Sequence, residues 1–408
     1  MFTELPLELV LHTVSFLTRL SGDYHLAKGV LEMQELIPDL PSINALSQTN
    51  TVLYSMLNET LYELCASVQP LGAAALLFAV AYELGSTLDK CVAAGISLDN
   101  EFIFGRPHSR CSLLYVAAAM GARAMVVKLL EMYGEGMMAR VHALGSSLDG
   151  TPLDCAARNE HMEIVRLLAP IPMPSPDVFL KISPSISVQL ESQGQYLGRA
   201  LIEAIGTSNL EISRYLVSEG ADVNVYQNFN TPLNKAISSK NLELVQFLLA
   251  SGADPNRSDG GFSPLFNAAD DGSVELIEAL LAAGANPHTR DSDSRNVFAV
   301  IRDIELWRLF LELRVDPNHQ DGFGSTALHY ACFLPTETAK ACIELLLQFG
   351  AATIQEADHE GFTPVDIAMQ DNNPEIVKML EPLVHDPELQ MKIGTWWKER
   401  EAADSDMS

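Results

Sequence analysis

The strongest constraint on the fold is a short pattern that returns after 32 residues. Thr231-Pro-Leu-Asn-Lys-Ala236 recurs as Ser263-Pro-Leu-Phe-Asn-Ala268, and Glu243-Leu-Val-Gln-Phe-Leu-Leu249 recurs as Glu275-Leu-Ile-Glu-Ala-Leu-Leu281. Each copy spaces its apolar residues as in a short helix followed by a longer one, and then a glycine opens a loop. The chain therefore contains neighbouring copies of one helical unit.

The residue types at the ends of these expected helices have physical roles. The hydroxyl of Thr231 can cap the first helix, and Pro232 stands at the first helical position, where a missing N–H costs nothing. Gly252 follows the second helix, where a left-handed residue is favoured. Leu233 on the first helix and Leu244 on the second belong to apolar faces that a two-helix unit cannot bury alone. Such units are expected to stack.

A repeat near 33 residues with a T-P-L-H-like start resembles the ankyrin-repeat family. Thr326-Ala-Leu-His-Tyr-Ala331 carries the fullest form of this motif, and Thr363-Pro-Val-Asp-Ile-Ala368 closes the series. The resemblance implies an all-α solenoid of helix-turn-helix-loop units. It also implies that His329 hydrogen-bonds to neighbouring backbone and stiffens the stack.

The repeats are expected in two blocks, residues 71–170 with about three units and residues 197–385 with about six. The unit at 296–318 lacks the T-P start and is interpreted as degenerate. Between the blocks, residues 171–196 contain four prolines within a short span, which excludes a helix interior. This insertion is either a hinge or a neutral surface excursion.

The N-terminal residues 1–64 predict a small helical module. Leu5-Pro-Leu-Glu-Leu, followed by Ser15-Phe-Leu17, resembles the opening of an F-box, and residues 43–62 are similar to the F-box remnant of fungal ankyrin-repeat proteins. Residues 18–40 form an insert between the two halves. The resemblance implies that the module binds the adaptor of a cullin-RING ubiquitin ligase through Leu5, Pro6, Leu9, Phe16, Leu46 and Leu53. Alternatively, the module only caps the end of the solenoid.

Residues 386–408 follow the last repeat and contain Trp396 and Trp397 beside charged residues. A terminal cap in which the tryptophans seal the last repeat is favoured over a docking peptide for a partner.

Composition bounds the partners and the compartment. The net charge of −27 repels phosphate backbones and anionic lipids, which argues against nucleic acid or membrane partners. The longest uncharged apolar run, residues 71–82, is too short to span a bilayer of about 30 Å. The six cysteines lie far apart without a C-x-x-C pair, and no secretion signal is visible, which together indicate an intracellular protein, cytoplasmic and/or nuclear.

The sequence does not predict an enzyme. It contains no H-E-x-x-H, no Walker A sequence, no G-x-S-x-G and no Cys/His set with zinc spacing. Its paired carboxylates, Asp270 with Asp271 and Asp291 with Asp293, fall at turns where solvated acids are ordinary. No catalytic residue, cofactor or metal site is expected.

A protein partner is expected instead, because stacked repeats provide a long surface with projecting loop tips. The favoured function is a substrate-recruiting F-box subunit of a cullin-RING ubiquitin ligase, whose ankyrin repeats bind the target. The alternative is a non-enzymatic scaffold or regulatory protein. The resemblance places the partner-binding residues at loop tips, where each is either a contact or an ordinary loop residue: Tyr226, Asn228, Phe229, Arg257, Asp259, Arg290, Asp293, His319, Phe323 and His359.

Overall fold

The computed structural model describes residues 69–99, 102–103, 110–142, 150–173, 192–227, 230–258 and 261–406. The F-box-like range 1–64, with its six adaptor-binding candidates, lies outside these residues. The chain divides into two compact units, Met1–Asp222 and Val223–Ser408.

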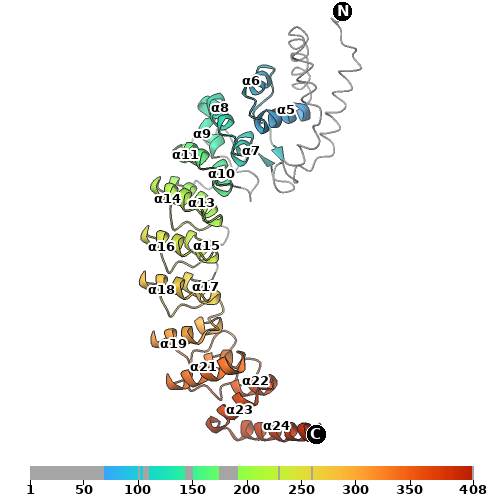
Figure 1. Cartoon of the computed structure of the whole chain (residues 1–408), viewed down its shortest axis with the longest axis vertical. Coiled ribbons are helices and arrows are strands. Elements are labelled where there is room, and N and C mark those ends of the chain that lie inside the picture. Colours follow the sequence, from blue (N-terminus) through green and yellow to red (C-terminus); the bar gives the residue numbers. More distant parts are fainter. Residues whose placement is uncertain are drawn as a thin grey trace, which may run out of the picture. The chain divides into compact units, whose positions relative to one another are not determined.

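The first unit contains helices that follow one another in antiparallel pairs (Figure 1). One minimal β-ladder joins β1 (Phe102–Ile103) to β2 (Arg110–Cys111) in antiparallel register. The pairs are α5 (Gln69–Ala81) with α6 (Gly85–Ala93), α7 (Leu113–Ala119) with α8 (Arg123–Tyr133), α10 (Pro152–Arg158) with α11 (Met162–Leu168), and α13 (Gln193–Gly206) with α14 (Leu210–Ser218). Between α8 and α10 lie η1 (Gly134–Gly136) and α9 (Met137–Val141).

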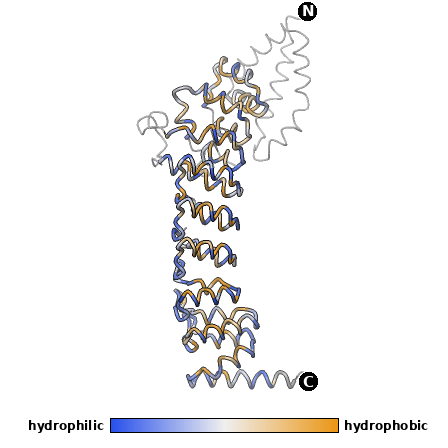
Figure 2. The backbone as a smooth tube through the Cα atoms, turned by 60° about the vertical axis from the view of Figure 1, so that its left-hand side comes forward, coloured by the Kyte–Doolittle hydropathy of each residue, from blue (hydrophilic) through white to orange (hydrophobic). Residues whose placement is uncertain are grey.

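The second unit repeats the same arrangement and ends in a long helix. The pairs are α15 (Pro232–Ser238) with α16 (Leu242–Ala250), α17 (Pro264–Asp271) with α18 (Val274–Ala282), η2 (Val297–Ala299) with α19 (Ile304–Glu312), α20 (Ala327–Cys332) with α21 (Thr336–Gln348), and α22 (Pro364–Gln370) with α23 (Pro374–Leu380). They are followed by η3 (Glu381–Leu383) and α24 (Pro387–Asp406). Figure 2 shows the connecting loops of this unit as largely hydrophilic and its helices as mixed or apolar.

These elements confirm the expected helical solenoid of stacked pairs. Within the described residues, β1, β2 and an isolated bridge between Gln227 and Asn230 are the extended pairings that an all-α description leaves out. The β1–β2 ladder lies in the longer connection that precedes α7.

The helix ends form as the residue types predict. The hydroxyl of Thr231 accepts a hydrogen bond from the N–H of Asn234 at 3.1 Å, and Pro232 is the first residue of α15. Ser263 caps α17 in the same way, through the N–H of Phe266 at 3.2 Å. Gly252 follows α16 with a φ of +91°, a conformation that favours glycine.

The core lies between successive helix pairs. Leu233, Ala236 and Ile237 of α15 are buried, and Leu244 and Leu248 of α16 are buried with them. Full burial of each large aliphatic side chain contributes about 1.5–3 kcal/mol relative to exposure. Because α15 packs on α17 and α16 packs on α18, a pair gains part of this stabilisation only from the next pair of the stack.

Asparagine side chains tie consecutive loops of the second unit together. Asn224 donates through Nδ2 to the carbonyl of Gly252 at 3.0 Å, and its Oδ1 accepts from the N–H of Asp254 at 2.7 Å. Asn256 makes the same two bonds to Gly284 and Asn286, and Asn318 makes them to Gly350 and Ala352. We call this row of bonds the asparagine ladder.

The degenerate unit interrupts the ladder. His288 occupies the position of Asn224, Asn256 and Asn318, and its side chain makes no hydrogen bond within the described residues. The first helix of this unit is reduced to the single turn η2. Its core is instead filled by large rings, with Phe298 stacked on the buried Trp307 at 5.0 Å between centroids.

The described residues at the two ends of the proline-rich insertion bond to each other. Gln193 accepts from the N–H of Met173 at 2.8 Å, and its Nε2 donates to the carbonyls of Ala169 and Ile171. Helix α13 then packs directly on α10. The helix pairs on either side of the insertion therefore pack against each other.

Helix α24 covers the last pair, but chiefly through aliphatic residues. Leu389 is 4% exposed and Ile393 is fully buried. Trp396 and Trp397 are half-buried and contact each other edge to face at 4.9 Å. Leu389 and Ile393 are therefore the buried side chains of α24, whereas the two tryptophans, which were predicted to seal the last repeat, stay partly exposed.

Candidate interaction surface

The hairpin tip at the start of the second unit exposes an aromatic residue. Tyr226 is 44% exposed and precedes the bridge between Gln227 and Asn230, whose backbone groups exchange hydrogen bonds of 3.0 and 2.9 Å. The other two candidates of this tip, Asn228 and Phe229, lie outside the described residues.

The next tip precedes α17. Arg257 is exposed, and its backbone N–H donates to the carbonyl of Asp254 at 3.3 Å. Phe262 is 36% exposed and lies 5.6 Å from the ring of Phe266, which is buried in α17. The candidate Asp259 is not among the described residues.

The three later tips share one internal construction. In each tip an aspartate accepts hydrogen bonds from two backbone N–H groups further along the turn. Asp321 accepts from Phe323 and Ser325 at 2.8 and 2.9 Å. Asp291 accepts from Asp293 and Arg295, and Asp358 accepts from Glu360 and Phe362. These carboxylates hold the turns in shape.

Backbone bonds join these tips into one continuous strip. The N–H of Gly322 donates to the carbonyl of Asp293 at 2.7 Å, and the N–H of His359 donates to the carbonyl of Phe323 at 2.9 Å. Nε2 of His319 lies 2.7 Å from the carbonyl oxygen of Ser294. Four of the predicted residues, Asp293, His319, Phe323 and His359, therefore belong to a single connected structure.

The side chains of this strip are accessible. Phe323 is 52% exposed, and Arg290, Asp293 and His359 are exposed as well. His319 is half-buried because its ring lies against the preceding tip. We define the tip strip as the residues of all five turns, from Tyr226 to His359, of which the last three are joined by the backbone bonds described above.

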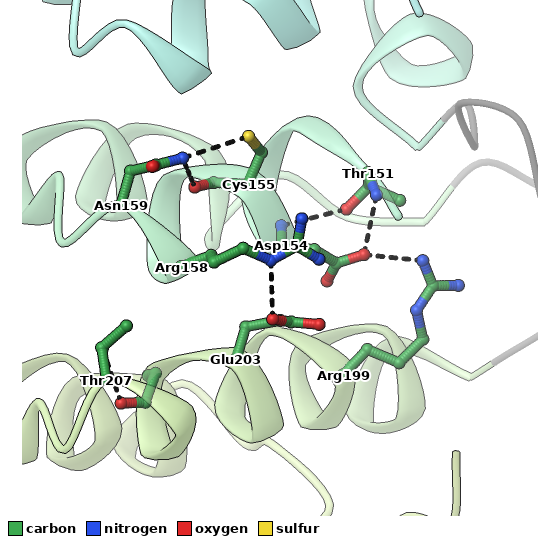
Figure 3. A network of polar contacts seen from close by, with 9 residues as sticks. Thr151, Asp154, Cys155, Arg158, Asn159, Arg199, Glu203 and Thr207 are labelled. Atoms are coloured by element: carbon green, nitrogen blue, oxygen red, sulfur yellow. Dashed lines mark hydrogen bonds and ion pairs between the residues drawn. The ribbon is translucent and has the colours of Figure 1, made fainter. Parts of the chain in front are cut away.

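A buried ion pair joins the first helices of two pairs in the first unit (Figure 3). Oδ2 of Asp154, on α10, lies 2.7 Å from Nη2 of Arg199, on α13, and the two side chains are only 3% and 5% exposed. The same carboxylate oxygen accepts from the N–H of Thr151 at 2.7 Å. Beside it, Arg158 donates to Glu203 at 2.8 Å. These contacts fix α13 on α10.

The equivalent position in the last pair has a similar pairing. Asp366, the fourth residue of Thr363-Pro-Val-Asp366, accepts from the N–H of Thr363 at 3.0 Å. Its other oxygen lies 3.0 Å from Nζ of Lys392, on α24. Each of these two acids thus pairs with a cation from a later helix, Arg199 on α13 or Lys392 on α24.

The structure confirms the role predicted for His329. Its Nδ1 accepts from the N–H of Thr326 at 3.0 Å, so Nε2 carries the proton and donates to the carbonyl of Phe362 at 3.1 Å. The ring therefore links one repeat to the next. Burial holds the pKa of His329 below its ordinary value, although the carbonyl of Phe362 and the acids Asp358 and Asp321 oppose that shift.

Sequence reasoning missed the role of Arg199. In register with the other repeats, Arg199 falls where threonine caps their first helix, but α13 already begins at Gln193. Ser192 and Gln195 form a capping box there, with bonds of 3.2 and 2.9 Å. The pattern Ser-x-x-Gln was the available indication of this earlier start.

The described residues contain no group of three or more His, Cys, Asp or Glu side chains arranged to hold a metal ion. Within the same residues, no helix combines the length and apolarity needed to cross a bilayer.

Comparison with known proteins supports the repeat assignment. A family model described as ankyrin repeats in three copies matches residues 114–227, 179–259, 201–291 and 297–390, which together cover more than half of the chain. No curated protein matches the chain.

Solved structures with similar folds include two ankyrin repeat domains. The human ASB11 ankyrin repeat domain covers 60% of this chain and 99% of its own, at 22% identity and a TM-score of 0.42. A domain from Acinetobacter baumannii AYE covers 45% and 96%, at 23% identity and a TM-score of 0.40.

Ankyrin repeats form protein-interaction modules, and the helix pairs, the T-P-L-H-like caps and the family match agree: this chain belongs to the ankyrin-repeat family.

Proposed function

We propose that this protein binds another protein along the tip strip and the neighbouring first helices, and that it has no catalytic activity of its own. The supporting observation is the strip itself, which exposes aromatic and arginine side chains and whose three later tips are joined by backbone bonds. Rigid aromatic and arginine side chains are the residues that interfaces favour, because little conformational entropy is lost when they bind.

Photo-crosslinking tests this surface. A benzophenone amino acid is introduced in place of Phe323 or Tyr226 on the strip, and in place of Val274, which is 38% exposed on the second helix α18. Partner adducts are expected at the two strip positions. Phe323→Asp should then reduce partner binding at least about tenfold, as for loss of an interface hot spot. Adducts found only at Val274 would refute the proposed surface.

We further propose that residues 1–64 recruit the adaptor of a cullin-RING ubiquitin ligase, which makes the protein a substrate-recruiting subunit. The support is the sequence Leu5-Pro-Leu-Glu-Leu with its F-box-like continuation. Two docking sites on one protein would raise the local concentration of substrate lysines near the ligase.

Co-purification tests this second role. The adaptor is expected to co-purify with the full chain, and Leu5→Asp combined with Pro6→Ala is expected to abolish the complex. Val274→Asp serves as the control and should leave it intact. If residues 1–64 act only as a cap, their deletion should unfold or precipitate the neighbouring repeats, and no adaptor should be recovered from the full chain.

We place the protein inside the cell, in the cytoplasm and/or the nucleus. Five described cysteines are buried and form no disulfide bond. Burial raises the pKa of Cys332 to about 12, which keeps that thiol protonated and unreactive. Fractionation of cells that express a tagged full-length chain tests the placement, and recovery from the culture medium would contradict it.

A further inference from the structure

In the tip strip, several aspartate carboxylates point toward the backbone of their own turns. The chain has a net charge of −27, but the tip aspartates Asp291, Asp321 and Asp358 all direct a carboxylate at backbone N–H groups of their own turns. Asp291 and Asp321 are each only 8% exposed. The carboxylates of Asp291 and Asp321 are therefore largely withdrawn from solvent, whereas Asp293 and Glu360 of the same tips are exposed.

Two arginines of the strip, unlike these buried aspartates, have exposed side chains. Arg257 and Arg290 are exposed on consecutive tips, and neither forms an ion pair within the described residues. Arg295, by contrast, lies 2.6 Å from Asp291 and 3.6 Å from Asp293. Arg257 and Arg290 thus present guanidinium groups that are available to a partner.

Exposed aromatic rings accompany these arginines. Phe262 is 36% exposed on the tip of Arg257, and Phe323 is 52% exposed on the tip after that of Arg290. Cation and aromatic ring therefore alternate along the strip. A partner segment that fits this order supplies carboxylates with apolar side chains beside them.

We propose that the strip binds an extended acidic segment of a protein partner, with one carboxylate on Arg257 and another on Arg290. This inference rests on the function proposed above and specifies the partner's chemistry. The net negative charge of the chain does not prevent such binding, because charges beyond about 8 Å are largely screened at physiological ionic strength.

The spacing of the tips also limits which acidic sequences can reach both arginines. Consecutive repeats are separated by about one helix diameter, roughly 10 Å. A polyproline II segment rises about 3.1 Å per residue and returns to the same side every three residues. Two acids three positions apart, Glu-x-x-Glu, therefore match Arg257 and Arg290 better than adjacent acids do.

Fluorescence anisotropy with short peptides tests this proposal on the full chain. The probes are fluorescein-labelled peptides of about 12 residues that contain Phe and Glu-x-x-Glu, with matched peptides carrying Gln-x-x-Gln, Lys-x-x-Lys or Glu-Glu. The Glu-x-x-Glu peptide is expected to bind about tenfold more tightly than its Gln form, and its affinity should fall as salt rises.

Matched charge reversals locate the binding. Arg257→Glu with Arg290→Glu is expected to weaken the Glu-x-x-Glu peptide at least about tenfold. The control, Arg302→Glu with Lys378→Glu, changes the net charge equally at two exposed cations away from the tips and should have little effect. Equal losses in both double variants, equal or tighter binding of the Gln or Lys peptide, or no binding of Glu-x-x-Glu at about 1 mM would overturn the proposal.

The interaction surface and the acidic chemistry of the partner can be refuted separately. If partner proteins crosslink at Tyr226 and Phe323 while acidic peptides do not bind, the acidic chemistry is wrong and the interaction surface stands. If crosslinks form only at Val274, the surface itself is wrong.

Discussion

Asp154 and Arg199 form an ion pair of 2.7 Å that is almost fully buried, although 45 residues separate them in the sequence. The pair joins α10 to α13 across the proline-rich insertion. A buried ion pair requires both partners, because either charge alone would be left without compensation in a low-dielectric interior.

Asp154→Ala is therefore expected to lower the free energy of unfolding by about 3–5 kcal/mol, since it leaves the Arg199 guanidinium without its carboxylate. Asp154→Leu combined with Arg199→Met should cost less than the single change, because it removes both charges. Urea denaturation followed by circular dichroism measures both variants. The exposed pair of Arg166 and Glu211, at 3.3 Å, provides the control, and Glu211→Ala should cost less than about 1 kcal/mol.

Asn234 is a candidate for stabilisation. It is fully buried at the motif position of His329, and neither of its amide atoms has a hydrogen-bond partner within the described residues. Asn234→His should supply an acceptor for the N–H of Thr231 and a donor toward the following repeat, as His329 does. We expect a gain of about 1–2 kcal/mol in the free energy of unfolding. The reciprocal change, His329→Asn, should destabilise, and a destabilised Asn234→His variant would contradict the argument.

The gap in the asparagine ladder predicts a second stabilising change. His288→Asn should restore bonds like those of Asn256, which donates to Gly284 at 3.1 Å and accepts from Asn286 at 2.7 Å. The expected gain is about 1–2 kcal/mol for two hydrogen bonds. Thermal unfolding of the full chain measures it. His288→Ala is the control and should be nearly neutral, because the His288 side chain makes no hydrogen bond within the described residues.

Acid should weaken the fold through two buried histidines. Burial holds the pKa of His329 and of His142 below the ordinary value of about 6.5. The unfolded chain therefore binds more protons than the folded chain below about pH 6.5, so stability falls as the pH is lowered from there toward the folded-state pKa values. Urea titrations at pH 7.5 and 5.5 should show this loss. The double variant His142→Gln with His329→Gln should show a smaller pH dependence over that interval.

The C-terminal cap depends on its aliphatic contacts. Ile393 is fully buried, so Ile393→Ala is expected to cost about 2–5 kcal/mol through lost burial and a cavity. Met391, on the same helix, is 74% exposed, and Met391→Ala should change stability by less than about 0.5 kcal/mol. Proteolysis of residues 387–406 provides a direct readout, because only the Ile393 variant should expose this segment. Equal effects would contradict the assigned packing.

Local features of this fold are predictable from the sequence because their physical causes are local. Thr231, Pro232 and Gly252 act within a few residues of their own helix ends, and the structure shows all three in the predicted roles. His329 is also predictable, because its partner Phe362 follows from the repeat spacing.

Features that depend on a distant partner were not predictable in the same way. A repeat motif aligned Arg199 with a capping threonine, and only the packing of α13 on α10 reveals its pairing with Asp154. The inward-turned carboxylates of the tips were likewise not predicted, because Asp291 was interpreted as a solvated loop acid and no sequence motif marks Asp321. For α24, the large tryptophan side chains were predicted to seal the last repeat, whereas Leu389 and Ile393 are the side chains that are buried.

The hydrogen bonds of Gln193 have a practical consequence. Because its side chain bonds to Met173, Ala169 and Ile171, the described residues at the two ends of the insertion lie close together. Ends this close can be bridged by almost any sequence at a small entropic cost. The segment between Met173 and Ser192 is thus a suitable insertion site for a protease site, an affinity tag or a fluorescent domain, because in the sequence it lies outside both proposed binding regions.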